Sequence, residues 1–226
     1  MRSSTSIFRL FFLCLMLQAF CVRPVLGAEA DGFRINTITP AVRARIVGHS
    51  YPKEAEARVP MRDLRYLTLL YVDAEGQTHQ GEMIVHKSIA RDVVDIFREL
   101  YAMRFPIERM ELMDNYDCQD EQSMRANNTS AFCFRTVKGS AKLSAHARGM
   151  AVDINPLYNP CFRLDANGRM RPGTLQPTTA APYANRSKVT SPYKISTKVV
   201  ELFARHGFRW GGYWRTVKDY QHFEKK

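Results

Sequence analysis

The chain has 226 residues, of which 45% are hydrophobic and 24% are charged. That length supports one domain with a full core, or one domain with a small appendage, and the composition is typical of a globular protein. Lysine and arginine outnumber aspartate and glutamate by 33 to 22, which gives a net charge of +11 and favours an anionic partner. No helix-turn-helix, zinc-finger or RNA-binding aromatic signature accompanies this charge, so we expect no nucleic-acid partner.

The N-terminus has the features of an export signal. Two arginines precede an apolar run at residues 10–22, which is too short to span a membrane comfortably, and the small residues Gly27, Ala28 and Ala30 follow it. We therefore expect a signal peptide over residues 1–28, cleaved after Ala28 or Ala30, and a periplasmic or secreted protein. A retained membrane anchor is the alternative. Cleavage after residue 28 leaves 30 basic and 22 acidic residues, a net charge of +8, so the anionic partner would be envelope material.

Residues 29–80 form an N-terminal extension or hairpin in this interpretation. The stretch at 41–47 starts a strand or a helix. Residues 61–72 end in an apolar, β-rich run, and 73–76 are typical of a turn. The strand at 82–86 then returns to complete a hairpin.

The clearest helix covers residues 88–103, where apolar residues recur at three- and four-residue steps and Ser88 is a suitable N-cap. Strands are predicted at 107–113 and at 131–137. The second of these would carry Arg135 towards a site formed by the motifs described below.

Residues 157–194 are rich in proline, asparagine, glycine, serine and threonine. We expect a long lid or rim loop there, because long irregular segments of compact domains are often functional; disorder is the alternative. A second helix is predicted at 196–206 with Gly207 as its C-cap, and 208–214 leads to a final strand. This order predicts an α+β fold, with helices around a mainly antiparallel sheet.

Three cysteines, Cys118, Cys133 and Cys161, lie beyond the predicted signal peptide. None has the Cys-x-x-Cys spacing of a thiolate metal site. An oxidising compartment favours one disulfide. We prefer the Cys118–Cys133 pair because both residues lie in the polar region before the motif, although the sequence leaves the pairing open.

Two short motifs carry the chemistry. The first, Ser-Ala-His-Ala-Arg-Gly-Met-Ala-Val-Asp at 144–153, offers His146 and Asp153. These residues are seven apart, so on one straight strand they would point to opposite faces. They can meet only if the chain turns between them, and Gly149 is where a turn is easiest. We expect His146 at the end of a loop and Asp153 in a strand over 150–154.

The second motif, Asp-Tyr-Gln-His-Phe-Glu at 219–224, has His222 on one face of a short strand over 221–224, with Asp219 just before it. Two imidazoles and a carboxylate can supply three metal ligands and leave the fourth coordination position open for water, as in a catalytic zinc site. A nearby carboxylate such as Asp219 can act as the base. A lone histidine is more often structural, and short motifs co-occur by chance, so the prediction depends on both motifs together.

Together with Trp210-Gly-Gly and Trp214, the patterns Ser-x-His-x-x-Gly-x-Ala-x-Asp and Asp-x-x-His-Phe-Glu resemble those of the zinc D-alanyl-D-alanine carboxypeptidase family. That family includes VanY-type carboxypeptidases, D-Ala-D-Ala dipeptidases and phage L-alanyl-D-glutamate endopeptidases. The resemblance runs from about Gly81 to the end and implies a zinc peptidase catalytic domain over 81–226. It also implies a Hedgehog/D-Ala-D-Ala-peptidase-like fold: α+β, a small mainly antiparallel sheet flanked by helices, and the zinc site at strand ends and loops.

By this resemblance His146, Asp153 and His222 bind Zn²⁺, Asp219 activates the metal-bound water, and Arg135 contacts a substrate carboxylate or carbonyl. Ser144 and Trp214 are two further candidate substrate-binding residues, and each also has a simpler structural explanation. Ser144 would contact substrate, or be a turn residue that bonds its own backbone. Trp214 would wall the substrate groove, although large aromatic residues more often pack in the core.

We therefore expect a monomeric zinc-dependent peptidase that hydrolyses peptidoglycan stem peptides, as a D-Ala-D-Ala carboxypeptidase or as an L-Ala-D-Glu-type endopeptidase. Its partners would be peptidoglycan peptides or an anionic envelope polymer. The alternative is a non-catalytic, metal-containing protein that binds the cell wall or a partner. The presence of Asp219 argues against that alternative, because a purely structural metal site needs no base.

Overall fold

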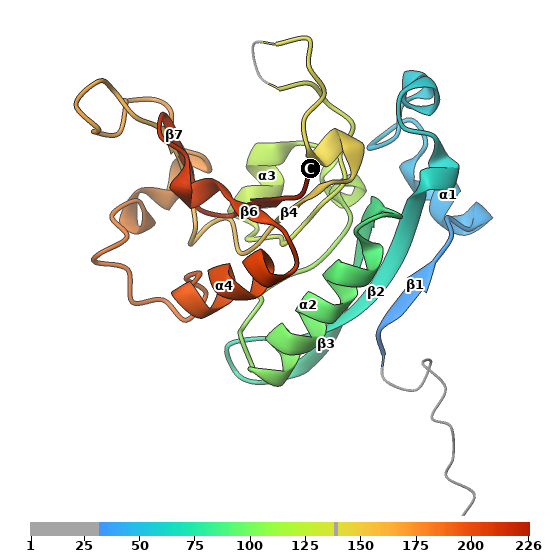
Figure 1. Ribbon diagram of the computed structural model, residues 1–226, viewed down its shortest axis with the longest axis horizontal. Coiled ribbons are helices and arrows are strands. Elements are labelled where there is room, and N and C mark those ends of the chain that lie inside the picture. The colour runs from blue at the N-terminus through green and yellow to red at the C-terminus, as the bar shows by residue number, and fades with distance from the viewer. Residues whose placement is uncertain (1–31, 138–139) are drawn as a thin grey trace, which may run out of the picture.

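The computed structural model describes residues 32–137 and 140–226, and it is an α+β structure with small antiparallel sheets (Figure 1). The predicted signal peptide at 1–28 lies outside the described residues. Within the described part, no helix has both the length and the apolar character needed to cross a membrane.

The N-terminal sheet has the order β1-β2-β3, with β1 at Arg34–Asn36, β2 at Leu64–Val72 and β3 at Thr78–His86. The predicted hairpin is confirmed: β2 and β3 pair antiparallel from Leu64–His86 to Val72–Thr78. The boundary expected at residue 81 lies inside β3. Helix α2, Ala90–Ala102, packs on one face of this sheet (Figure 1).

Helix α1, Pro40–Ile46, settles the open choice at 41–47 in favour of a helix. Thr39 caps it by accepting a hydrogen bond from Val42 N at 3.3 Å, and Pro40 occupies the first turn, where its missing N–H costs nothing. Two 3₁₀ helices follow, η1 at Lys53–Ala57 and η2 at Met61–Asp63.

The two predicted helices are confirmed as α2 and as α4, Thr197–Arg205. The N-cap of α2 is Ile89 rather than Ser88, because the Ser88 hydroxyl instead forms a hydrogen bond of 2.7 Å with His86 Nδ1. Ser196 stands at the N-cap of α4. The two helices contact each other beside the hairpin (Figure 1).

The C-terminal part contains two more antiparallel sheets instead of an extension of one sheet. The first has the order β4-β8-β6, with β4 at Ala151–Asp153, β6 at Arg209–Trp210 and β8 at His222–Glu224. The second pairs β5, Cys161–Arg163, with β7, Val217–Asp219. These strands have two or three residues each, and strands this short do not build one continuous sheet.

The strands predicted at 107–113 and 131–137 are wrong. In the first segment, Ile107 N donates to Val72 O at 2.8 Å and Met110 O accepts from Glu82 N at 3.1 Å, while in the second Phe134 N donates to Ser50 O at 3.0 Å. The backbone groups of each segment bond one at a time to different elements, so no continuous strand pairing forms. Helix α3, Asp120–Arg125, and the 3₁₀ helix η3, Met113–Tyr116, lie between them.

The segment 157–194 is folded rather than irregular throughout, since it contains β5 and the 3₁₀ helix η5, Thr178–Tyr183. The fully buried Asn159 organises it. Its side-chain oxygen accepts from Ile195 N at 2.9 Å and from Arg186 Nη1 at 2.8 Å, and its amide donates to Tyr193 O at 3.0 Å. The rim is therefore fixed to the domain and is not disordered.

One hydrophobic core joins the two halves. Residues of the hairpin and α2 pack with Val152 and Phe223 from the C-terminal sheet, and the rings of Phe203 and Phe223 stack with centroids 3.8 Å apart. A second core cluster lies between α1, η1 and η2 and the segments around Phe132 and Ala147. The strands that carry the motif residues are thus anchored from both sides.

Candidate metal centre

The first motif folds into a tight reversal. His146 begins the 3₁₀ helix η4, His146–Arg148, and Gly149 follows with a φ of +67°. A Cβ at Gly149 would lie 2.5 Å from His86 N, whose N–H donates to Gly149 O at 2.9 Å. Only glycine meets both conditions without strain, so the turn predicted at this position is confirmed.

Strand pairing then brings the second motif to the first. Strand β4 lies antiparallel to β8, and Asp153 stands directly opposite His222. Directly paired residues project to the same face of a sheet, so the carboxylate and the imidazole meet. The reversal at Gly149 turns His146 back towards this pair.

Three donor atoms converge as a result. His146 Nε2 is 3.1 Å from His222 Nδ1 and 3.3 Å from Asp153 Oδ2, and His222 Nδ1 is 3.0 Å from Asp153 Oδ1. His146 Nδ1 is 2.6 Å from the carbonyl oxygen of Ala131, which can only accept, so Nδ1 carries the proton and Nε2 presents its lone pair. His146, Asp153 and His222 form a group that could hold a metal ion.

The spacing of the three atoms fits one small cation. Nitrogen and oxygen ligands bind zinc at about 2.0–2.1 Å, so two ligands of a tetrahedral ion stand about 3.3 Å apart. The observed separations of 3.0–3.3 Å lie close to that value. Both imidazoles are buried, and His222 Nε2 lies 3.6 Å from Glu224 Oε2, where the carboxylate can orient the ring.

Electrostatics couple the three groups tightly. Burial favours the neutral form of Asp153, but the two imidazoles outweigh it and hold the pKa of this carboxyl well below its usual range. Burial alone would lower the pKa of His222, whereas the Asp153 and Glu224 carboxylates raise that pKa to about 10. The site therefore keeps a carboxylate charge that can pair with a cation.

Asp219 ends β7 and lines the same pocket without belonging to the group of three. Its Oδ1 is buried and has no hydrogen-bond partner in the part of the chain described. Burial raises the pKa of its carboxyl, and the nearby negative charge of Asp153 acts in the same direction. A Cβ at Gly211 would lie 2.6 Å from Asp219 O, so this glycine lets the backbone of Asp219 approach closely.

The pocket has a volume of about 260 Å³. Arg135 lines it and pairs with Asp120 at 2.9 Å. The Trp214 ring lies 5.2 Å from the His222 ring. Ser144 Oγ accepts from Ala147 N at 3.0 Å, which is the contact expected of the turn role. All the predicted site residues thus surround one cavity; its walls include Asp120, Ser130, Arg135, Ser144, His146, Asp153, Cys161, Trp214, Asp219, His222 and Glu224.

Two residues at this pocket were not singled out by sequence reasoning as part of the site. Cys161 stands opposite Asp219 in the β5–β7 pair, and its thiol hydrogen-bonds to the Asp219 carboxylate. Asp120 holds Arg135. Neither lies in a motif, because each depends on strand or helix contacts between distant segments. The three residues of β5, Cys-Phe-Arg, are too few to show a period.

The three cysteines of the described residues, Cys118, Cys133 and Cys161, are free thiols. Cys118 and Cys133 nevertheless contact each other, and a hydrogen bond to Cys133, together with burial, raises the pKa of the Cys118 thiol. The preferred pair is therefore adjacent but not bridged.

One family of known proteins resembles the C-terminal part of the chain. Residues 138–225 match a family model described as D-alanyl-D-alanine carboxypeptidase. The searches of curated proteins and of solved structures gave no match. The matched segment holds both motifs but begins later than Gly81, where the resemblance was expected to start. It supports a peptidase of the D-Ala-D-Ala carboxypeptidase kind. The match over residues 138–225 therefore supports the D-alanyl-D-alanine carboxypeptidase family that the motifs predicted.

Proposed function

We propose that this protein is an exported, monomeric, zinc-dependent peptidase that hydrolyses peptidoglycan stem peptides. The observation that carries the proposal is the convergence of His146 Nε2, His222 Nδ1 and the Asp153 carboxylate at 3.0–3.3 Å in one pocket that also contains Asp219. Three protein ligands with a free position beside a carboxylate favour a catalytic site over a structural one.

His146, Asp153 and His222 would hold the zinc ion. Bound there, zinc would supply Lewis-acid chemistry, which polarises a carbonyl and makes water a stronger nucleophile near neutral pH. The protein contributes the orientation of the ligands: Ala131 O fixes the tautomer of His146, and Glu224 faces the outer nitrogen of His222.

Asp219 is suited to proton transfer. Its unpartnered Oδ1 can accept a proton from the attacking water and return it to the nitrogen of the leaving amine. Burial raises the pKa of this carboxyl, which makes it a stronger base than an exposed aspartate. Gly211 leaves room for Asp219 and His222 to lie close together, since a Cβ there would lie 2.9 Å from Asp219 Cβ and 3.3 Å from His222 Cβ.

Arg135 and Trp214 would hold the substrate. The guanidinium of Arg135 is only partly neutralised by Asp120, which bonds its Nε, so the terminal nitrogens of its planar fork can bind a substrate carboxylate. A terminal carboxylate bound at Arg135 favours carboxypeptidase action on D-Ala-D-Ala. Cleavage within the stem peptide, as by an L-Ala-D-Glu endopeptidase, is the other outcome that product masses would reveal.

Export rests on the apolar segment at 10–22 and its flanking residues. A mature chain with a net charge of +8 would be attracted to the anionic envelope in which such peptides occur.

The test compares two substitutions that should have different effects on zinc binding. Asp219→Ala should keep zinc and lose activity by about 10²–10⁴-fold, because it removes only the base. His146→Ala should lose the metal. His49→Ala, which changes an exposed histidine outside the pocket, is the matched control and should keep both. Cleavage of muropeptides by Asp219→Ala at the wild-type rate would show that the assigned mechanism is wrong.

A further inference from the structure

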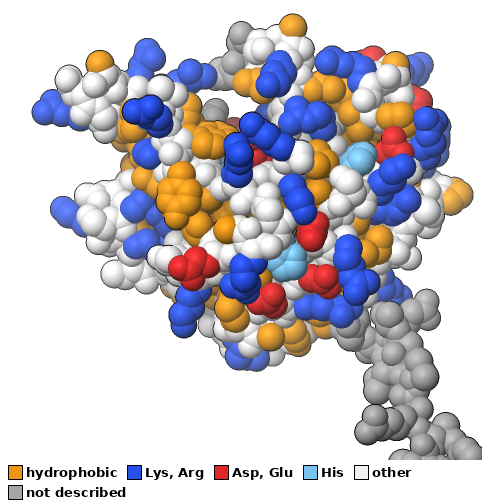
Figure 2. All heavy atoms as spheres, viewed as in Figure 1, with side chains coloured by type: hydrophobic (Ala, Val, Ile, Leu, Met, Phe, Trp, Pro, Cys, Tyr) orange, Lys and Arg blue, Asp and Glu red, His pale blue; other side chains and the backbone are white. Residues whose placement is uncertain are grey.

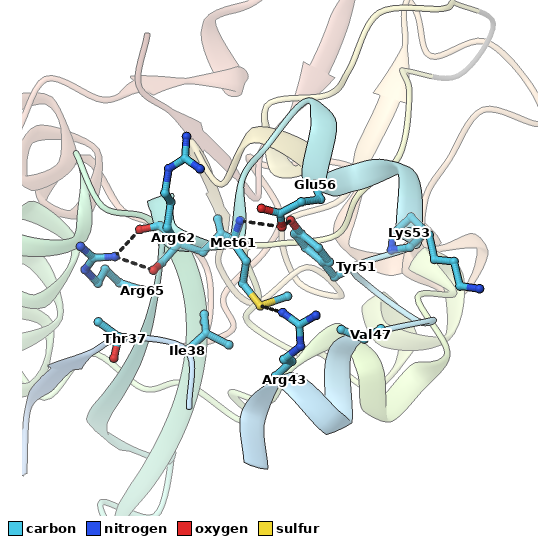
Figure 3. Close-up of a pocket in the computed structure, with 12 residues that line it drawn as sticks. Thr37, Ile38, Arg43, Val47, Tyr51, Lys53, Glu56, Met61, Arg62 and Arg65 are labelled. Carbon is cyan, nitrogen blue, oxygen red and sulfur yellow. Dashed lines mark hydrogen bonds between the residues drawn. The ribbon is translucent and has the colours of Figure 1, made fainter. Parts of the chain in front are cut away.

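A large cavity lies away from the metal centre, in the N-terminal part of the chain. It has a volume of about 710 Å³ and lies between α1, η1, η2 and the start of β2 (Figure 3). It is outside the segment 138–225 that matches the peptidase family. Its walls are Thr37, Ile38, Arg43, Val47, Tyr51, Pro52, Lys53, Glu56, Met61, Arg62, Leu64 and Arg65.

The walls are strongly basic. Four of the lining residues carry a positive charge, and Glu56 is the single acid among them. Glu56 is already engaged: its Oε2 accepts from the Tyr51 hydroxyl and from Met61 N, the latter at 3.1 Å. One carboxylate held in this way leaves an excess of three positive charges around the cavity.

Arg43 contacts a neutral acceptor and forms no ion pair with a carboxylate in the described chain. Its Nη1 donates to the thioether sulfur of Met61 at 3.3 Å, and Figure 3 shows its side chain reaching from α1 towards this sulfur, below Tyr51 and Glu56. A thioether is a weak, neutral acceptor. In contrast, Arg45 on the same helix forms two hydrogen bonds to Glu82, at 2.8 and 2.5 Å. On this helix, Arg45 lies outside the cavity and is neutralised by Glu82. Arg43 lies beside the cavity and has no ion-pair partner in the described chain.

The other basic side chains that line the cavity can also bind an anion. Arg65 donates only to the carbonyl oxygens of Arg62 and Leu64, at 2.9 and 2.8 Å, which positions its guanidinium without cancelling its charge (Figure 3). No ion pair of Lys53 or of the Arg62 side chain with a carboxylate occurs within the described residues. Lysine and arginine side chains are spread over the face drawn in Figure 2, interspersed with aspartate and glutamate.

The floor of the cavity is rigid, which separates it from an ordinary basic surface. Tyr51, Met61 and Leu64 are buried members of the second core cluster. The Tyr51 hydroxyl also donates to Val59 O at 2.9 Å. Arg43 and Arg65, whose guanidinium groups are held by Met61 and by backbone carbonyl oxygens, should lose little freedom when an anion binds.

We propose that this cavity is a second binding site, for an anion with several negative charges carried by a phosphate- or carboxylate-bearing polymer. Guanidinium groups bind both kinds of oxyanion with paired hydrogen bonds. More than one negative charge is needed to match an excess of three positive charges. The site is independent of the peptidase function, since it shares no residue with the metal centre.

The test is calorimetric titration of the full chain with tripolyphosphate and, separately, with a short polyglutamate. Arg43→Gln and Arg62→Gln should each weaken binding by about fivefold. Glu56→Gln should strengthen it, because the amide oxygen still accepts from Tyr51 and Met61 while the negative charge is removed. This gain of affinity cannot arise from misfolding.

Arg169→Gln is the matched control, since it removes one exposed arginine far along the chain and should leave binding unchanged. Both probes can also bind a metal ion. All the variants keep the same metal centre, so a difference in affinity between them reports on the cavity. Preference for one probe identifies the polymer as phosphate- or carboxylate-bearing. Absence of binding to both probes, or equal weakening by Arg43→Gln and Arg169→Gln, would overturn the proposal.

Discussion

Substitution of Gly149 by alanine should disturb the turn that brings the metal ligands together. The residue has a φ of +67°, and a Cβ there would lie 2.5 Å from His86 N and 3.1 Å from Val85 C. Both neighbours are backbone atoms of β3, so no side chain can rotate away to make room. The methyl group therefore has to push η4 and β3 apart.

The expected cost has two parts. Alanine in the left-handed region loses about 1–2 kcal/mol, partly offset by the lower entropy of its unfolded chain. Separation of η4 from β3 weakens the 2.9 Å hydrogen bond from His86 N to Gly149 O and strains the packing, which together cost about 2 kcal/mol. We expect a loss of about 3 kcal/mol in the free energy of unfolding.

Gly168→Ala measures the backbone strain without the steric cost. Gly168 has a φ of +74°, and a Cβ there would have nothing within 4 Å, so its substitution should cost about 1 kcal/mol from backbone strain alone. Urea denaturation of both variants, without metal, gives the difference. Gly149→Ala should also bind zinc more weakly, because His146 moves relative to Asp153. Equal destabilisation by the two substitutions would refute the reasoning.

Three further substitutions test other parts of the structure. Glu224→Gln should lower zinc affinity by about 10–100-fold in competition with a chelator, because Glu224 orients His222 from 3.6 Å; unchanged affinity would mean that Glu224 is only a surface residue. Asn159→Ala should lower the free energy of unfolding by about 3 kcal/mol in urea, because it leaves several buried groups of the rim unpaired; a loss below about 1 kcal/mol would contradict that role. Glu82→Gln should cost about 1 kcal/mol at pH 7. Burial raises the pKa of Glu82, but hydrogen bonds from Arg45 and Tyr66 outweigh it and lower the pKa below 4.5. Its stabilisation is therefore present above pH 4.5 and lost as the pH falls through the folded-state pKa, so the wild type should lose more stability on acidification than the variant.

Local patterns were sufficient to predict much of the site. The odd spacing of His146 and Asp153 required a turn, Gly149 was the residue that could make it, and the structure has the reversal there. The hairpin and the helices α2 and α4 were visible because their apolar residues follow one period over many positions.

Other features depend on contacts that a local pattern does not contain. Residues 107–113 and 131–137 contain many apolar residues, as strands do, but their backbone groups bond to several different elements. The two- and three-residue strands of the C-terminal half are too short to show a period. Cys161 faces Asp219 only because β5 pairs with β7 across more than fifty residues.

The most direct test of the proposed activity is incubation of a defined stem pentapeptide ending in D-Ala-D-Ala with the zinc-loaded protein, with product masses measured by mass spectrometry. We predict release of the terminal alanine, loss of this product in the presence of a chelator, and its return when zinc is restored. Product formed at an undiminished rate in the metal-free protein, or no cleavage of any stem peptide by the zinc-loaded protein, would contradict the assignment of His146, Asp153 and His222 as the ligands of a catalytic zinc ion.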